Sequence, residues 1–228
     1  FGISLNTVIT FLGAITAVIL LVFRDTILGF VTGIHVSTSK NLKIGDWIGI
    51  PKYNIEGNIQ DINLLTTKIV NFDKTISTIP TYDLLSTEIR NHQVMYEGSS
   101  RRIKRSIYFN IKSFKFVDDE FYEKVKDINL ISEYLDRKLR EIAESKKNIP
   151  HAERIINGQQ LTNIGLFRNY VLNYLKNNPK VDQDEIVLVR QLEISPQGMP
   201  LEIYCFANKA ELVDYERIQA DIFDHILT

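Results

Sequence analysis

The stretch FGISLNTVITFLGAITAVILLVF (residues 1–23) contains no charged side chain. At roughly 1.5 Å per residue, a helix from Ile3 to Phe23 would be about 31 Å long, which matches the hydrocarbon core of a bilayer. A secretory signal would instead have a shorter apolar run between a basic start and a cleavage site. The stretch therefore predicts a membrane-spanning helix, and a buried helix of a soluble protein is the alternative.

One face of this helix carries small or hydroxylated residues at spacings of three and four, namely Thr10, Gly13, Ala14 and Ala17. In lipid, where no hydrophobic force drives helices together, small residues allow two helix backbones to approach closely. This face is therefore predicted to pack against another helix, either a different one or a copy of itself. A simple single-helix anchor has no need of such a face.

A second helix is predicted for RDTILGFVTGIHVS (residues 24–37), because its apolar residues recur at helical spacing. They are Ile27, Phe30, Val31 and Ile34. Gly29 and Gly33 lie four residues apart on another side. Asp25 is unfavourable in lipid, so the membrane core should end near Arg24. We expect an amphipathic helix that follows a bend and lies along the interface or under a neighbour. One longer straight helix is the alternative.

Charge and cysteine content indicate the cellular compartment of the residues that follow the two helices. Lys40 and Lys43 follow the second helix, whereas no lysine or arginine precedes Arg24, so the C-terminal side is predicted to face the cytoplasm. The single cysteine, Cys205, excludes an internal disulfide and fits a reducing compartment. The net charge of −1 gives the whole chain no bias toward polyanions. The chain begins at Phe1, and we interpret it as a fragment of a longer protein.

Residues 40–96 are predicted to form a small β domain. Five short alternating runs lie within roughly fifty residues, a number typical of a small barrel or a curled sheet, here Sm-like. The runs are residues 44–50, 58–64, 66–71, 75–79 and 86–91. Phe72, Asp73 and Lys74 are a plausible hairpin turn, and Pro80 ends the strand that follows.

Residues 97–228 are predicted to form an α+β domain of ferredoxin-like character with a helical insertion. The expected strands are residues 106–112, 185–195 and 201–207, and the expected helices are residues 119–146, 165–178 and 211–226. Residues 148–160 are an expected loop. Together with a first domain at residues 1–39, which holds the membrane helix and its continuation, this gives three domains.

A basic cluster precedes the first of these strands and consists of Arg101, Arg102, Lys104 and Arg105. It fits either an anionic partner, such as a lipid headgroup, or a charged strand edge or linker. No aromatic residues alternate with the basic ones in the way used for base stacking, so we expect no nucleic-acid partner.

No sequence motif indicates catalysis. The chain has no phosphate loop, dinucleotide glycine motif, zinc-ligand spacing or nucleophile elbow. Its four histidines are scattered, and Cys205 lies in an expected strand where it is more easily buried than reactive. We therefore expect no enzyme activity, no metal and no cofactor.

The order of these features resembles the small-conductance mechanosensitive channel (MscS) family. A helix with a Gly/Ala-rich face leads into an amphipathic half, and KIGDWIGI (residues 43–50) then opens a β domain. The matching positions are Gly45, Asp46, Gly57, Ile59, Ile62, Thr66, Thr67, Asp73, Ile79, Pro80 and Asn91. The resemblance is specific over residues 10–95. The longer C-terminal part is most like the YbdG, or miniconductance, subgroup.

The resemblance implies a homoheptamer in the bacterial inner membrane, with residues 1–23 as the third membrane helix of each subunit and the later domains in the cytoplasm. The two leucine rings of the family's pore fall on Ala17 and Leu21, of which only Leu21 is a leucine. Leu20 and Phe23 are alternative constriction residues. The kink glycine falls on Asp25 and the preceding glutamine on Arg24.

The function implied is a channel that membrane tension opens and that releases ions and small solutes during hypo-osmotic shock. Its partners would be further copies of the chain and membrane lipids. The alternative is a membrane-tethered scaffold that holds a cytoplasmic partner through the β domain and the basic cluster. The small-residue face of the first helix favours the channel, because a tether requires no close helix packing.

Overall fold

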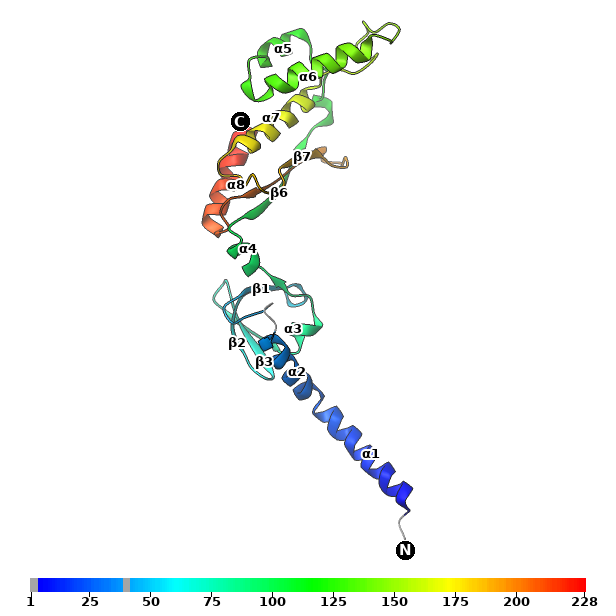
Figure 1. The fold of residues 1–228 in the computed structure, drawn as a ribbon, viewed down its shortest axis with the longest axis vertical. Helices are drawn as coiled ribbons and strands as arrows, with labels where there is room; N and C mark the ends of the chain where they lie inside the picture. Colours follow the sequence, from blue (N-terminus) through cyan, green and yellow to red (C-terminus); the bar gives the residue numbers. More distant parts are fainter. Residues whose placement is uncertain (1–3, 39–41) are drawn as a thin grey trace. The chain divides into compact units, whose positions relative to one another are not determined.

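The computed structural model describes residues 4–38 and 42–228, and the chain divides into two compact units (Figure 1). Unit 1 ends at Glu97 and unit 2 begins at Gly98. Lys40, on which part of the charge argument rests, lies outside the described residues.

Two helices begin unit 1, α1 (Leu5–Val22) and α2 (Arg24–Thr38). Ser4 caps α1, because its side chain accepts a hydrogen bond from the Thr7 amide at 3.2 Å. The helix is interrupted at Phe23, whose φ of −96° and ψ of 7° depart from helical values. The break is one residue before Arg24, where the membrane core was expected to end. α2 continues in the general direction of α1, so the predicted bend is not confirmed (Figure 1).

The rest of unit 1 is an antiparallel sheet with strand order β4-β3-β2-β1-β5. The strands are β1 (Trp47–Ile50), β2 (Ile55–Ile62), β3 (Thr66–Asn71), β4 (Ile76–Pro80) and β5 (Arg90–Asn91). Short helical turns lie between or after them, namely η1 (Pro51–Tyr53), α3 (Asp83–Ser86) and α4 (Gln93–Glu97). Alternation along the strands places Ile48, Ile50, Ile59, Ile69 and Ile79 in one buried apolar core, which Leu84 of α3 completes.

This sheet is not a closed barrel. β4 and β5 are its two edges, and no pairing joins them among residues 42–97, so the barrel-like prediction is not confirmed. The expected strand at residues 86–91 is also mostly wrong, since only Arg90 and Asn91 pair with β1. Residues 83–86 form α3 instead, and the Thr87 hydroxyl closes its end by donating to the Asp83 carbonyl at 2.8 Å. A two-residue strand leaves little backbone with which to close a barrel.

Unit 2 is an α+β region built on a three-stranded antiparallel sheet with order β6-β8-β7. Its strands are β6 (Arg101–Phe109), β7 (Leu188–Gln191) and β8 (Met199–Ala207). Its helices are η2 (Ile111–Ser113), α5 (Asp119–Val125), α6 (Asn129–Lys146), α7 (Asn163–Asn177) and α8 (Leu212–Leu227). A ferredoxin-like sheet has a fourth strand, so the finer prediction for residues 97–228 is not confirmed.

Unit 2 has two apolar cores. The larger core joins the sheet to α7 and α8, and the smaller joins α5, α6 and the start of α7. The single helix expected over residues 119–146 is two helices, because Ile128 adopts an extended conformation between them. Cys205 lies in the larger core with no exposed surface, and burial raises the pKa of its thiol to about 12. This agrees with the expectation of a buried, unreactive cysteine.

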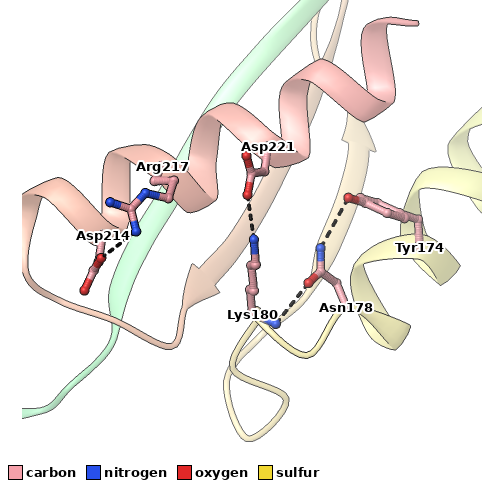
Figure 2. A network of polar contacts seen from close by, with 6 residues as sticks. All are labelled: Tyr174, Asn178, Lys180, Asp214, Arg217 and Asp221. Atoms are coloured by element: carbon pink, nitrogen blue, oxygen red, sulfur yellow. Dashed lines mark hydrogen bonds and ion pairs between the residues drawn. The ribbon is translucent and has the colours of Figure 1, made fainter.

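Polar contacts attach the C-terminal helix to the end of α7 (Figure 2). The Asn178 side chain donates to the Tyr174 hydroxyl at 3.3 Å and accepts from the Lys180 amide at 2.9 Å. The Lys180 ammonium group lies 2.6 Å from the Asp221 carboxylate on α8. These contacts fix the loop between α7 and the sheet at the surface of the larger core.

Candidate pore-lining site

The surface of α1 is apolar and uncovered. None of its residues is buried, and its large apolar side chains are between 41% (Val8) and 76% (Leu5) exposed. At eighteen residues the helix is about 27 Å long, and it is the one helix in the described part of the chain that is long and apolar enough to cross a membrane. Lipid or other chains must cover such a surface in the working protein.

Hydroxyl groups on α1 are satisfied within the helix itself. Thr10 donates to the Asn6 carbonyl at 2.9 Å, and Thr16 donates to the Leu12 carbonyl at 2.8 Å. Backbone acceptors thereby replace water as the partners of these hydroxyls, as a lipid environment requires. The two threonines are therefore compatible with a membrane-spanning helix.

The sequence-predicted packing and gate residues share one face of α1. At 100° per residue they fall within an arc of about 120°. They are Thr10, Gly13, Ala14, Ala17, Leu20 and Leu21. Phe23, the remaining gate candidate, lies at the interruption between the helices. No described atom lies within 4 Å of a Cβ built at Gly13, so this face has room for a helix of another chain.

The candidate kink and pore-mouth residues on α2 separate into two groups. They are Arg24, Asp25, Gly29 and Gly33. Arg24 and Asp25 are exposed in its first turn, where the Asp25 carboxylate is favourably placed at the positive end of the helix. Gly29 is buried farther along. A Cβ at Gly29 would overlap the carbonyl oxygen of Leu64, whereas one at Gly33 would meet no described atom within 4 Å. Gly29 is thus a contact point with the β2–β3 turn, a role that the sequence did not indicate.

Two buried threonines support the turn on which α2 lies. The Thr81 hydroxyl donates to the Asn63 carbonyl at 2.7 Å, and the Thr81 amide donates to the Leu65 carbonyl at 3.0 Å. The Thr67 and Thr81 hydroxyls are 3.0 Å apart, and neither residue has exposed surface. Sequence reasoning missed Thr81, and the available signal was a hydroxyl directly after the strand-ending Pro80.

We expect Thr81→Val to lower the free energy of unfolding by about 1–3 kcal/mol, because it removes the hydrogen bond to the Asn63 carbonyl and takes a partner from the buried Thr67 hydroxyl. Thr78→Val is the matched control three residues earlier, on β4, where the side chain is exposed and a change within about 0.5 kcal/mol is expected. Thermal unfolding of the two purified variants measures the difference. Equal losses from both would show that the buried hydroxyl pair does not support the turn.

Asp46 and Asn91 connect the beginning and end of the β domain. The Asp46 carboxylate accepts hydrogen bonds from the Lys43 amide at 2.9 Å and from the Asn91 side chain at 3.0 Å. Gly45 precedes it with a φ of +96°, a conformation that favours glycine. Three of the positions that carry the family resemblance thus form one structural unit, the turn that leads into β1.

The basic cluster of unit 2 is split by strand alternation. Arg101 and Arg105 lie over the rings of Tyr215 and Phe223 on α8, at 4.5 and 4.8 Å. On the opposite face, Lys104 lies 3.8 Å from the buried Glu202 carboxylate, which Arg190 also contacts at 2.7 Å. The four basic residues therefore form no single patch, an arrangement that favours the charged-strand interpretation over an anionic partner.

No group of three or more potential metal ligands is present in residues 4–38 or 42–228. The features that stand out chemically are the apolar helix α1, its small-residue face and the contact of α2 with its own β domain.

Comparison with known proteins agrees with this arrangement. Residues 25–94 match the family model described as the beta-domain of mechanosensitive ion channels. Over its whole length, the chain is 24% identical to the low conductance mechanosensitive channel YnaI of Escherichia coli, of which it covers 52%. Over 90 residues, or 40% of the chain, it is 31% identical to the small-conductance mechanosensitive channel MscMJ of Methanocaldococcus jannaschii, of which it covers 25%.

Solved structures show the same fold. The cryo-EM structure of MSL1 from Arabidopsis thaliana superimposes with a TM-score of 0.63 at 17% identity, over 99% of this chain and 63% of that one. The closed-state crystal structure of Helicobacter pylori MscS gives a TM-score of 0.56 at 15% identity, over 99% and 67% of the two chains. The similarity to mechanosensitive channels is thus shown by the beta-domain model over residues 25–94 and by the shared fold, and the chain spans about half the length of the curated relative that it matches from end to end.

Proposed function

We propose that the chain is the pore-lining and cytoplasmic part of a mechanosensitive ion channel subunit. The observation that carries the proposal is the uncovered apolar helix α1, which continues within the same unit into a mechanosensitive-channel beta-domain. Membrane tension opens the channel by favouring a state of larger area in the membrane, and ions and small solutes then leave the cell during hypo-osmotic shock. The family is one of ion channels, and we propose no catalytic activity.

In this proposal α1 lines the pore with the face that carries Ala17 and Leu21. Leu21 forms the principal apolar ring, with Leu20 or Phe23 next to it as the alternative constriction. Such a ring blocks ions by emptying the pore of water without closing it sterically. Thr10, Gly13 and Ala14 pack against neighbouring copies of α1, and Arg24 and Asp25 place charge at the cytoplasmic mouth.

The assembly that we propose is a homoheptamer in a multi-pass arrangement in the bacterial inner membrane, with the sheets of both units in the cytoplasm. Two observations support self-association. The apolar stripe of α2 is not covered by its own β domain, since Ile27, Phe30, Val31 and Ile34 are 45–56% exposed. The small-residue face of α1 is equally open. That the chain is most like the YbdG subgroup remains a prediction.

The test is reconstitution of the full-length protein into liposomes free of other channels, followed by suction on excised patches. We expect currents that appear above a threshold tension and are absent below it. Mass measurement of the detergent-solubilised protein should give a ring-forming oligomer. A monomer or dimer, or patches that stay silent up to rupture, would contradict the channel and favour the tethered scaffold.

A further inference from the structure

A cavity of about 530 Å³ lies on the sheet of unit 1, away from α1 and α2. Its volume is in the range of small-molecule sites, about 300–1,000 Å³. β1, β2, the end of β3 and the segment around β5 provide its lining. Gly49, which lines it, lies between the core residues Ile48 and Ile50, so the cavity is on the face of β1 opposite the isoleucine core.

Gly49 forms the floor of this cavity between two opposite charges. It pairs with Glu56 on β2 and with Arg90 on β5, so both side chains leave the sheet on the same face as Gly49. Neighbouring strands are about 4.8 Å apart, so the backbones of Glu56 and Arg90, on either side of β1, are roughly 10 Å from each other. A Cβ at Gly49 would come within 3.1 Å of the His92 imidazole, so glycine makes room for this ring between the two charged residues.

The Arg90 side of the cavity is suited to a carboxylate. The Arg90 Nε atom donates to Glu88 at 2.9 Å, and its two terminal nitrogens form no hydrogen bond with any described residue. His92 packs against Trp47 with ring centroids 4.9 Å apart and the ring planes tilted by 35°, and its ring nitrogens likewise have no hydrogen-bond partner among residues 4–38 and 42–228. A guanidinium group with free terminal nitrogens binds a carboxylate through paired, charge-assisted hydrogen bonds.

The Glu56 side of the cavity is suited to an ammonium group. One Glu56 oxygen accepts from the Trp47 indole at 3.1 Å, and the Glu56 carboxylate has no ion pair in the described part of the chain. The Phe72 ring meets Trp47 edge-on, with ring centroids 5.4 Å apart, and Phe72 is 58% exposed. Aromatic surface therefore adjoins the Glu56 carboxylate. The carboxylate and the aromatic surface both favour a ligand that carries positive charge.

We propose that this cavity binds a zwitterionic small solute whose ammonium group lies against Glu56 and whose carboxylate lies against Arg90. A dianion such as a phosphate ester would meet the carboxylates of Glu56 and Asp73, which both line the cavity. A simple cation would give the terminal nitrogens of Arg90 no partner, because, within the described part of the chain, only the Nε atom is bonded, to Glu88. The Glu56 side and the Arg90 side of the cavity are far enough apart to favour a solute whose ammonium and carboxylate groups are separated by several bonds. A solute in which the two groups are adjacent fits less well.

The test uses 5-aminopentanoate as the probe, with glycine, pentylamine and pentanoate as comparisons, and the assembled full-length protein in calorimetric titration. We expect 5-aminopentanoate to bind with a Kd at least about tenfold below that of each comparison. Glu56→Gln and Arg90→Gln should each raise its Kd by about tenfold or more, because each removes a charge-assisted contact. Glu97→Gln and Lys68→Gln, exposed residues that do not line the cavity, are the matched controls and should leave the Kd unchanged.

The proposal is overturned if 5-aminopentanoate shows no saturable binding to the assembled protein, as would happen if a second copy of the chain covered the cavity. It is also overturned if pentylamine or pentanoate binds equally well, or if the controls weaken binding as much as the cavity variants do. The readout is binding and requires no current, so its failure is distinguishable from failure of the channel function.

Discussion

Replacement of Gly29 by alanine should displace α2 from its own β domain. The added methyl group would overlap the Leu64 carbonyl oxygen, and both groups are backbone or attached directly to it, so no side-chain rotation relieves the contact. The turn cannot yield easily, because Thr81 holds the carbonyls of Asn63 and Leu65. We expect the free energy of unfolding of unit 1 to fall by about 1–3 kcal/mol, although alanine favours a helix over glycine by about 1 kcal/mol.

Gly33→Ala is the matched control, because it makes the same chemical change one helical turn later on α2. No described atom lies within 4 Å of a Cβ at Gly33, so only the gain in helix propensity should remain. Thermal unfolding of the two variants should therefore give midpoints on opposite sides of the parent value. If Gly29→Ala is as stable as Gly33→Ala, the close contact between α2 and the β2–β3 turn does not exist in solution.

The contrast between the two glycines shows what local sequence reasoning can and cannot reach. The helices at residues 5–22 and 24–38 were predictable, because absence of charge and helical periodicity are local signals. The strand at residues 66–71 was predicted with its observed bounds, since alternation ends there at a turn. No signal in the sequence distinguishes Gly29 from Gly33. They differ only because a turn thirty-five residues later (from Gly29 to Leu64) folds back onto one of them.

The same limit explains the misplaced elements. Four basic residues within five positions are interpreted from the sequence as a linker, a strand edge or a patch. They lie in β6, where α8 supplies rings for two of them and Glu202 supplies a carboxylate for a third. The open sheet of unit 1 is a further case. Periodicity indicates which face of a strand is buried, but it does not indicate whether the first and last strands meet. The gate candidates Ala17 and Leu21 were placed by resemblance, and they share a face of α1 because their spacing is helical.

Leu21→Ser should lower the tension at which the proposed channel opens, or make it leak at rest. Leu21 is 74% exposed on α1, so nothing within the chain depends on its packing. The hydroxyl group would hydrate the constriction and favour the water-filled state. Patch recordings should show a lower threshold relative to the parent protein, and cells that express the variant should grow slowly. Ile19→Ser is the control, because Ile19 lies two residues earlier on nearly the opposite face of the same helix and should leave the threshold unchanged.

The size of this effect follows from symmetry. Loss of about 20 Å² of apolar surface from the pore wall of one copy is worth about 0.5 kcal/mol. In the proposed ring of seven copies the same loss would occur seven times, so the closed state would lose about 3.5 kcal/mol, a shift of several hundredfold in the ratio of closed to open channels. A tethered scaffold would show no such amplification, because its copies act separately. An unchanged threshold in Leu21→Ser would place the constriction at Leu20 or Phe23, and serine at those two positions would then have to produce the shift.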